Sequence, residues 1–251
     1  MSAIPSVRDA DLDFDHGTFD SAAFAAEALS NWQSLAAVID HTLLKPEATR
    51  SQVESLCDEA VCYRFACAMV NPMWVSTAVG MLAGTGVPVG VVIGFPLGAS
   101  LVSTLRHEAA ALVKLGAREL DMVIPIGQLK SGNHQSVERT IHACANVAHH
   151  GGALLKVILE TALLNVEEKL RGSEIAIQAG ADFIKTSTGF AASGATAADV
   201  ALMRGVAGAR AGVKASGGIR TLADVRAMLE AGANRIGASA SVAIVREFGA
   251  E

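Results

Sequence analysis

The sequence predicts an α/β fold of the (β/α)8 TIM barrel class, in which eight parallel strands close on themselves and helices cover the outside. Short apolar segments typical of buried strands alternate with helical patterns about eight times along the chain. The length of 251 residues suits such a barrel built as one domain. Three glycines, Gly116, Gly180 and Gly232, each lie between a helical pattern and the next strand, where glycine commonly ends a helix. A doubly wound open sheet is the alternative, but no strand is followed by a G-x-G-x-x-G turn.

The chain divides near residue 33. We expect residues 1–33 to form a short N-terminal helical extension and residues 34–251 to form the barrel domain. A helix capped by Asp20 or Ser21 is expected to run to Leu29. The stretch before it is acidic and typical of a solvated surface, with aspartates at Asp9, Asp11, Asp13 and Asp15.

Eight segments after Trp32 have the apolar character of buried strands. They lie at residues 35–39, 65–70, 87–93, 119–123, 154–158, 183–185, 212–215 and 235–237. The segments between them place apolar residues three or four apart, as an amphipathic helix does; Leu101, Leu105, Ala109 and Leu112 are one example. Strand and helix therefore alternate from residue 35 to the end of the chain, as the barrel requires.

The composition excludes several classes of function. The net charge of −5 and the pI of about 5.8 offer no basic surface for nucleic acid. Four cysteines without a C-x-x-C pair suggest neither a disulfide framework nor a zinc site. No apolar run is long enough to span a membrane, and residues 1–15 lack the apolar segment of a secretory signal. We therefore expect a cytoplasmic protein without membrane or nucleic-acid partners.

Polar residues at the carboxyl ends of the strands are the candidates for chemistry, because the active site of this fold lies there. The first strand is expected to supply Asp40, and the later strands Asp121, Lys156, Glu160, Lys185 and Lys214. Burial disfavours the charged form of a lysine, which lowers the pKa and makes the amine a nucleophile. The alternative is a lysine whose stem packs while its ammonium reaches solvent.

Lys185 and Lys214 end neighbouring strands and should therefore lie side by side. Two ammonium groups in contact cannot both stay charged cheaply, so the pKa of one must drop. Gly212 is expected to leave space below Lys214 inside the barrel. The structural alternative is an internal network of lysine–aspartate ion pairs that holds the barrel together.

Two glycine loops predict a phosphate site. Residues 216–221 follow the seventh strand, residues 237–241 follow the eighth, and each loop opens a helix. Loops at these positions form the usual phosphate pocket of the barrel through free backbone N–H groups. The expected contacts are Gly217, Gly218, Gly237 and the hydroxyl of Ser239, whereas Arg220 either assists or lies on the helix surface.

Six segments, in this order, resemble the deoxyribose-phosphate aldolase family, and the likeness extends from about residue 36 to about residue 245. The segments are IDHTLLKP at 39–46, VIGFPLG at 92–98, ELDMV at 119–123, LKVILET at 155–161, FIKTSTG at 183–189 and VKASGGIRT at 213–221. The resemblance implies a class I, Schiff-base aldolase that works without metal or cofactor. Such an enzyme cleaves 2-deoxy-D-ribose 5-phosphate reversibly to acetaldehyde and D-glyceraldehyde 3-phosphate.

The resemblance also assigns roles. By position, Lys185 matches the amine that forms the imine, Lys214 the lysine that lowers its pKa, and Asp121 the carboxylate that relays protons. The substrate-binding set that it implies is Asp40, Lys156, Thr188, Gly189, Gly217, Gly218, Gly237 and Ser239. The family analogy further implies a homodimer.

The chain departs from parts of the family. Phe190 stands where some members carry a lysine, Ala240 follows Ser239 where some have a second serine, and Met69 stands where a cysteine is common. The chain ends at Glu251 without the terminal tyrosine of some members, so we expect no proton-transfer help from such a tail. Two rival functions stay open: another Schiff-base reaction, transaldolase-like or a dehydration, and a non-catalytic barrel that binds a phosphate ligand.

Overall fold

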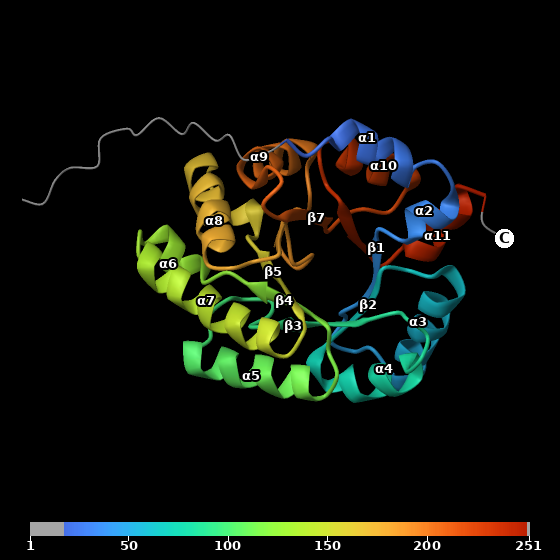
Figure 1. Cartoon of the computed structure of the whole chain (residues 1–251), viewed down its shortest axis with the longest axis horizontal. Coiled ribbons are helices and arrows are strands. Elements are labelled where there is room, and N and C mark those ends of the chain that lie inside the picture. Colours follow the sequence, from blue (N-terminus) through green and yellow to red (C-terminus); the bar gives the residue numbers. More distant parts are fainter. Residues whose placement is uncertain (1–17, 250–251) are drawn as a thin grey trace, which may run out of the picture.

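The computed structural model describes residues 18–249, and its strands form a closed parallel barrel (Figure 1). Each strand pairs with the next in the chain, and the eighth pairs with the first. The strands are β1 (Ile39–Leu43), β2 (Cys67–Val70), β3 (Val89–Ile93), β4 (Glu119–Val123), β5 (Leu154–Ile158), β6 (Phe183–Lys185), β7 (Gly212–Ser216) and β8 (Arg235–Ala238). The predicted (β/α)8 barrel is confirmed.

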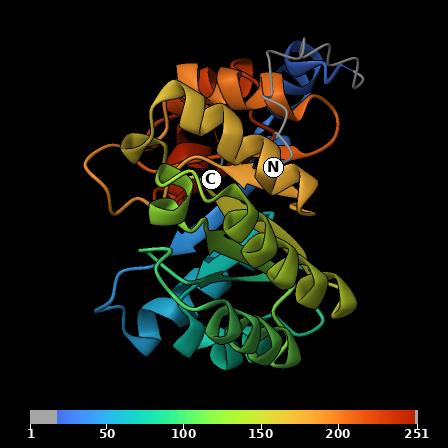
Figure 2. The same ribbon diagram turned by 90° about the vertical axis from the view of Figure 1, so that its left-hand side faces the viewer.

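Helices surround the barrel, as Figures 1 and 2 show from two directions. They are α1 (Ser21–Ala28), α2 (Trp32–Ala36), α3 (Arg50–Tyr63), α4 (Val75–Leu82), α5 (Val102–Lys114), α6 (Ile126–Lys130), α7 (His134–His150), α8 (Val166–Gln178), α9 (Ala197–Ala207), α10 (Leu222–Glu230) and α11 (Ser241–Glu247). Two 3-10 turns, η1 (Pro72–Trp74) and η2 (Thr161–Leu163), follow β2 and β5. Among the described residues, no helix combines the length and apolarity that crossing a membrane requires.

The expected bounds of β4, β5 and β6 are confirmed, but the first strand was placed wrongly. Residues 35–39 were expected to form it, whereas the start of that segment belongs to α2, which ends at Ala36, and β1 begins only at Ile39. Asn31 caps α2, since its side chain accepts a hydrogen bond from the Ser34 N–H at 2.8 Å. Leu35 and Ala36 are buried on this helix. A short apolar run has the same pattern in a buried helix turn as in a buried strand, so the sequence did not separate the two.

The described part of the N-terminal extension packs against the end of the chain. Asp20 caps α1 and accepts a hydrogen bond from the Ala23 N–H at 2.9 Å, which confirms the predicted helix. Helix α1 contacts α10 and α2 contacts α11 (Figure 1). The acidic stretch Asp9–Asp15 lies outside the described residues, and the domain boundary near residue 33 stays a prediction.

The interior of the barrel is divided by polarity. On the β2–β3 side, Cys67, Met69 and Val92 form a small buried apolar cluster with Leu44. On the opposite side, strands β4 to β8 place charged residues inside the barrel, while their alternate residues, such as Leu120 and Ile184, join the large apolar core beneath the helices. Along strands β4 to β8, the alternation thus separates a hydrophobic outer layer from charged side chains inside the barrel.

Candidate active site

A buried network of ion pairs fills the centre of the barrel. Asp121 receives three lysines: its Oδ1 lies 2.9 Å from Lys156 Nζ, and its Oδ2 lies 2.7 Å from both Lys185 Nζ and Lys214 Nζ. The register explains this meeting, because Asp121 pairs with Lys156 across β4 and β5, and Lys185 pairs with Lys214 across β6 and β7. Lys185 and Lys214 lie side by side as expected, and their amines are joined through Asp121 Oδ2, which bonds both.

A second layer of the network lies nearer the amino ends of the strands. Asp40 Oδ2 lies 2.5 Å from Lys214 Nζ and 3.5 Å from Lys156 Nζ, and its Oδ1 lies 2.6 Å from Arg235 Nε. Glu119 is bonded by Lys156 and, at 2.6 Å, by Arg235 Nη2. Four cations therefore face three carboxylates, so the cluster holds one positive charge in excess when every group is ionised.

The excess charge is most easily lost from Lys185. Lys156 touches three carboxylates and Lys214 touches two, whereas Lys185 touches only Asp121. Burial lowers the pKa of Lys185 to about 8, and Lys214 adds to this against the opposing pull of Asp121. The contact with a second ammonium that the sequence predicted therefore contributes, but desolvation is the larger cause.

Two members of the network, Asp121 and Lys156, are held charged. Burial works against the ionised form of Asp121, but the ammonium groups of Lys156, Lys185 and Lys214 outweigh it and keep the pKa of Asp121 well below its ordinary value. Burial likewise opposes the charge of Lys156, but the surrounding carboxylates raise its pKa well above the usual range. Asp121 and Lys156 therefore hold their charges beside one amine, that of Lys185, whose pKa is about 8.

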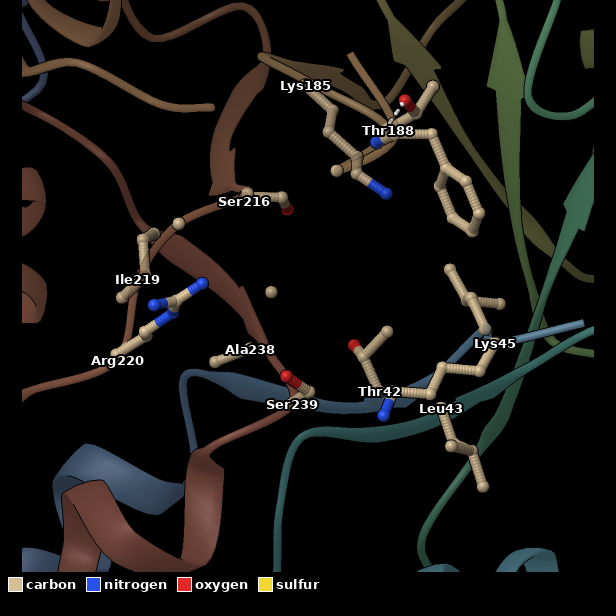
Figure 3. A pocket seen from close by; sticks show the side chains of 16 residues that line it. Thr42, Leu43, Lys45, Lys185, Thr188, Ser216, Ile219, Arg220, Ala238 and Ser239 are labelled. Carbon is tan, nitrogen blue, oxygen red and sulfur yellow. Dashed lines mark hydrogen bonds between the residues drawn. The ribbon is translucent and has the colours of Figure 1, made fainter. Parts of the chain in front are cut away.

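Next to this network lies a cavity of about 430 Å³ at the carboxyl ends of the strands, and Lys185 is part of its wall. Figure 3 shows its amine pointing into the cavity from β6. The walls come from the segments that follow β1, β6, β7 and β8. The lining contains three cations, Lys45, Lys185 and Arg220, and no carboxylate. The cavity is therefore suited to an anion, although the whole chain carries a net charge of −5.

The glycine loops present free backbone donors to this cavity. Gly217 and Gly218 have φ values of 88° and 79°, which glycine adopts without strain. Within residues 18–249, the backbone N–H groups of Gly217, Gly218 and Ser239 donate no hydrogen bond. Gly194 supports the loop from behind, because a Cβ there would lie 2.1 Å from the Gly217 carbonyl oxygen. Unpaired N–H groups at the entry to a helix are a common binding site for phosphate.

Glu160 fixes the loop that follows β6. Its carboxylate accepts a hydrogen bond from the Thr188 hydroxyl and lies 3.3 Å from the Thr188 backbone nitrogen. Thr188 Oγ1 in turn accepts a hydrogen bond from the Phe190 N–H at 3.0 Å. The ring of Phe190 packs edge-on against Phe95, with the ring centres 5.3 Å apart. Glu160 therefore positions the cavity wall and does not line the cavity itself.

The structure separates the predicted site residues into two groups. Seven line the cavity: Lys185, Thr188, Gly189, Gly217, Gly218, Gly237 and Ser239. Asp40, Asp121, Lys156 and Lys214 do not line it and lie fully buried in the ion-pair network. The placement of Asp40 at the end of the first strand was wrong, because Asp40 is the second residue of β1 and lies one layer deeper. The space expected at Gly212 is also absent, since the Phe183 ring lies where a Cβ would be.

Sequence reasoning missed several residues of the site. Thr42, Lys45 and Ser216 line the cavity, and Arg235 closes the lower layer of the network. Thr42 and Lys45 were missed because β1 was placed too early in the chain. Ser216 and Arg235 were detectable from the alternation along their strands, since Ser216 faces the same side as Lys214, and Arg235 the same side as Gly237.

One group within the network has the ligand types of a metal site. A thiol sulfur and two carboxylate oxygens from Cys67, Asp40 and Glu119 lie within 4.8 Å of one another. Both carboxylates, however, are already paired with Lys156 and Arg235. Burial, together with both carboxylates, raises the pKa of Cys67 well above its ordinary value, which disfavours the thiolate that metals bind. The arrangement is therefore that of an ion-pair cluster.

Known proteins resemble the chain over most of its length. The family model described as DeoC/LacD family aldolase matches residues 11–249. A deoxyribose-phosphate aldolase of Thermoanaerobacter sp. (strain X514) is 53% identical over 216 residues, which is 86% of this chain and 97% of that protein. One of Listeria monocytogenes is 54% identical over 212 residues, 84% of this chain and 95% of that protein. A solved deoxyribose phosphate aldolase from Aeropyrum pernix, described as tetrameric, has a TM-score of 0.84 at 35% identity and covers 91% of this chain and 97% of its own.

Proposed function

Because the chain belongs to the DeoC/LacD family of aldolases, we propose that it cleaves 2-deoxy-D-ribose 5-phosphate to acetaldehyde and D-glyceraldehyde 3-phosphate through a Schiff base on Lys185. The relatives named above are called deoxyribose-phosphate aldolases. The observation that carries the proposal is the Lys185 amine, which titrates at about 8, touches one carboxylate and opens into a cation-lined cavity.

The reaction follows from the chemistry of this amine. The free amine adds to the aldehyde carbon of the open-chain sugar, and loss of water leaves an iminium ion. The bond between carbons 2 and 3 then breaks, and its electron pair enters the iminium to give an enamine. The hydroxyl on carbon 3 loses its proton and becomes the aldehyde of glyceraldehyde 3-phosphate. Protonation of the enamine at carbon 2 and addition of water release acetaldehyde and restore Lys185.

Lys214 and Asp121 support this step in different ways. Lys214 keeps a cation beside Lys185 and so favours the neutral amine. Asp121 bonds both amines through one oxygen, and this contact supports its role as the carboxylate that relays protons, through a water molecule, between the network and the cavity. Asp40 and Lys156 hold Lys214 and Asp121 in place from the layer below.

The phosphate is assigned to the far end of the cavity. Gly217, Gly218 and Ser239 line the cavity and have backbone N–H groups free to bind the phosphate, and Arg220 points into the cavity in Figure 3. Figure 3 shows Lys185 and Arg220 at separate places on the cavity wall, so we assign the aldehyde carbon of the substrate to Lys185 and its phosphate to the donors near Arg220. The homodimer and the cytoplasmic location expected from the sequence stay predictions.

Trapping tests the proposal directly. Borohydride added to the enzyme with acetaldehyde should reduce the imine and leave an ethyl group on Lys185, located by peptide mass spectrometry. In parallel, 2-deoxyribose 5-phosphate should yield acetaldehyde in amounts equal to glyceraldehyde 3-phosphate. Labelling of another lysine contradicts the assigned nucleophile. Labelling of Lys185 without release of acetaldehyde favours a transaldolase-like or dehydrating enzyme, and no labelling favours a barrel that only binds a phosphate ligand.

The pH dependence follows from the pKa of Lys185. A protonated amine has no lone pair for attack, so kcat/KM should rise about tenfold per pH unit below pH 8 and become level above it. The measurement is kcat/KM for 2-deoxyribose 5-phosphate between pH 6 and about 9.5, with circular dichroism to confirm that the fold persists. A profile that stays flat across pH 7 to about 9 contradicts a Lys185 amine that titrates in this range.

A further inference from the structure

Lys45 is a cation of the cavity wall, and it lies in a loop that was not predicted from the sequence to be part of the site. It lies in residues 44–49, between β1 and α3, and lines the same cavity as Lys185. Figure 3 shows Lys45 and Arg220 on opposite sides of the cavity. The cavity is thus flanked by two cations in addition to the amine assigned to the reaction.

The backbone around Lys45 is fixed, whereas its side chain is unengaged. The carbonyl of Leu44 accepts a hydrogen bond from Asn71 Nδ2 at 3.0 Å, and the carbonyl of Lys45 accepts one from the Ala48 N–H at 3.1 Å. The Lys45 ammonium is exposed and makes no ion pair or side-chain hydrogen bond within residues 18–249. A rigid loop therefore presents a charge that nothing in the described protein uses.

The other two cations of the lining each lie near a carboxylate. Lys185 is bonded to Asp121 and serves the aldehyde end of the substrate. Arg220 lies beside Asp224, whose carboxylate accepts the Arg220 backbone N–H at 2.9 Å and interacts with its charge. Within the described part of the chain, Lys45 has no such carboxylate partner. A bound phosphate carries two negative charges, and neutral N–H groups do not neutralise them. A cation at the cavity wall without a carboxylate partner would therefore stabilise the bound phosphate.

The remaining wall offers no substitute for this cation. The loop that follows β6 borders the cavity with Phe190, whose ring packs on Phe95. Residues 189–196 contain no charged side chain. Any cationic contact beyond Arg220 must therefore come from the β1 side of the cavity, where Lys45 is the lining residue with a charge.

We propose that Lys45 binds the phosphate of the substrate through its ammonium group, from the side of the cavity opposite Arg220. This inference rests on the proposed aldolase function and names a further residue for the phosphate end. Because Lys45 is exposed, its contribution is electrostatic, sensitive to salt, and made equally before and during the reaction. Lys45 therefore adds to the affinity for phosphorylated substrates given by the N–H groups and Arg220, and the rate of the bound complex is set elsewhere.

The test compares two acceptors in the synthetic direction, D-glyceraldehyde 3-phosphate and D-glyceraldehyde, each with acetaldehyde at low ionic strength. For Lys45→Gln, KM for the phosphorylated acceptor should rise about tenfold while kcat changes less than about twofold. With unphosphorylated glyceraldehyde, kcat/KM should stay within about twofold of the parent, because no charge is contacted. Lys45→Arg should keep most of the affinity, and about 0.5 M salt should reduce the difference between the parent and Lys45→Gln.

Lys114→Gln is the matched control, because it removes the same charge at the exposed end of α5, where the strands begin and far from the cavity. It should leave both acceptors unaffected. An equal loss with both acceptors from Lys45→Gln would show a structural role for the loop and overturn the inference. An unchanged KM for the phosphorylated acceptor would overturn it as well. A parent enzyme that joins acetaldehyde to neither acceptor would instead refute the proposed function itself.

Discussion

Replacing Lys185 by alanine should lower kcat for cleavage of 2-deoxyribose 5-phosphate by at least about 10⁴-fold. The physical reason is that no Schiff base with the substrate can form without this amine. Lys214 and Lys156 stay bound to carboxylates at Asp40 and Asp121 and do not line the cavity. The measurement is a coupled assay of glyceraldehyde 3-phosphate release, with borohydride trapping on the variant to look for labelling elsewhere.

The variant is expected to fold, because the network loses one of four cations that face three carboxylates and so loses its excess charge. Thermal unfolding and circular dichroism check this. Lys130→Ala is the control: it removes a lysine that bonds Glu168 at 3.0 Å and does not line the cavity, so it should keep activity. Folded Lys185→Ala enzyme with activity within a few-fold of the parent would refute the Schiff-base mechanism.

Asp121→Asn should damage both stability and activity. The carboxylate is fully buried and receives the ammonium groups of Lys156, Lys185 and Lys214, so its neutral replacement leaves these cations with too little negative charge. Breaking a buried ion pair by removal of one partner typically costs about 3–5 kcal/mol of folding free energy. We expect a clear fall in the unfolding midpoint in urea and a loss of at least about 10²-fold in kcat.

The pH profile separates the catalytic part of this effect from the structural part. Asp121 raises the pKa of Lys185 against burial, so its removal should shift the rise in kcat/KM to lower pH. Asp199→Asn is the control, since it breaks the pair with Lys169 at 2.6 Å on the outer helices and should not move the profile. An Asp121→Asn enzyme with unchanged profile and parental kcat would exclude Asp121 from the chemistry.

The sequence identified the right residues for much of the site but placed some of them at the wrong depth. Asp121 and Lys185 were identified because their strands have short, clear apolar patterns whose expected bounds match β4 and β6, and Lys214 because its strand was expected only one residue shorter than β7. Asp40 was placed one layer too high, because the helix α2 was taken for a strand. A misplacement of four residues in one element therefore hid Thr42 and Lys45, which line the cavity after β1.

By itself, the sequence determined the order of strands and helices, the closed barrel and the lysines and glycine loops on which the site depends, since periodicity, glycine positions and motifs are local properties of the chain. Only the tertiary structure decided which charges meet. Strand register and burial around the barrel decide that Lys156 contacts three carboxylates and Lys185 only one. They also decide that one oxygen of Asp121 bonds both Lys185 and Lys214. Desolvation and pairing of a charge are set by neighbours distant in the chain, and for that reason the lysine that titrates near neutrality emerges only from the folded barrel.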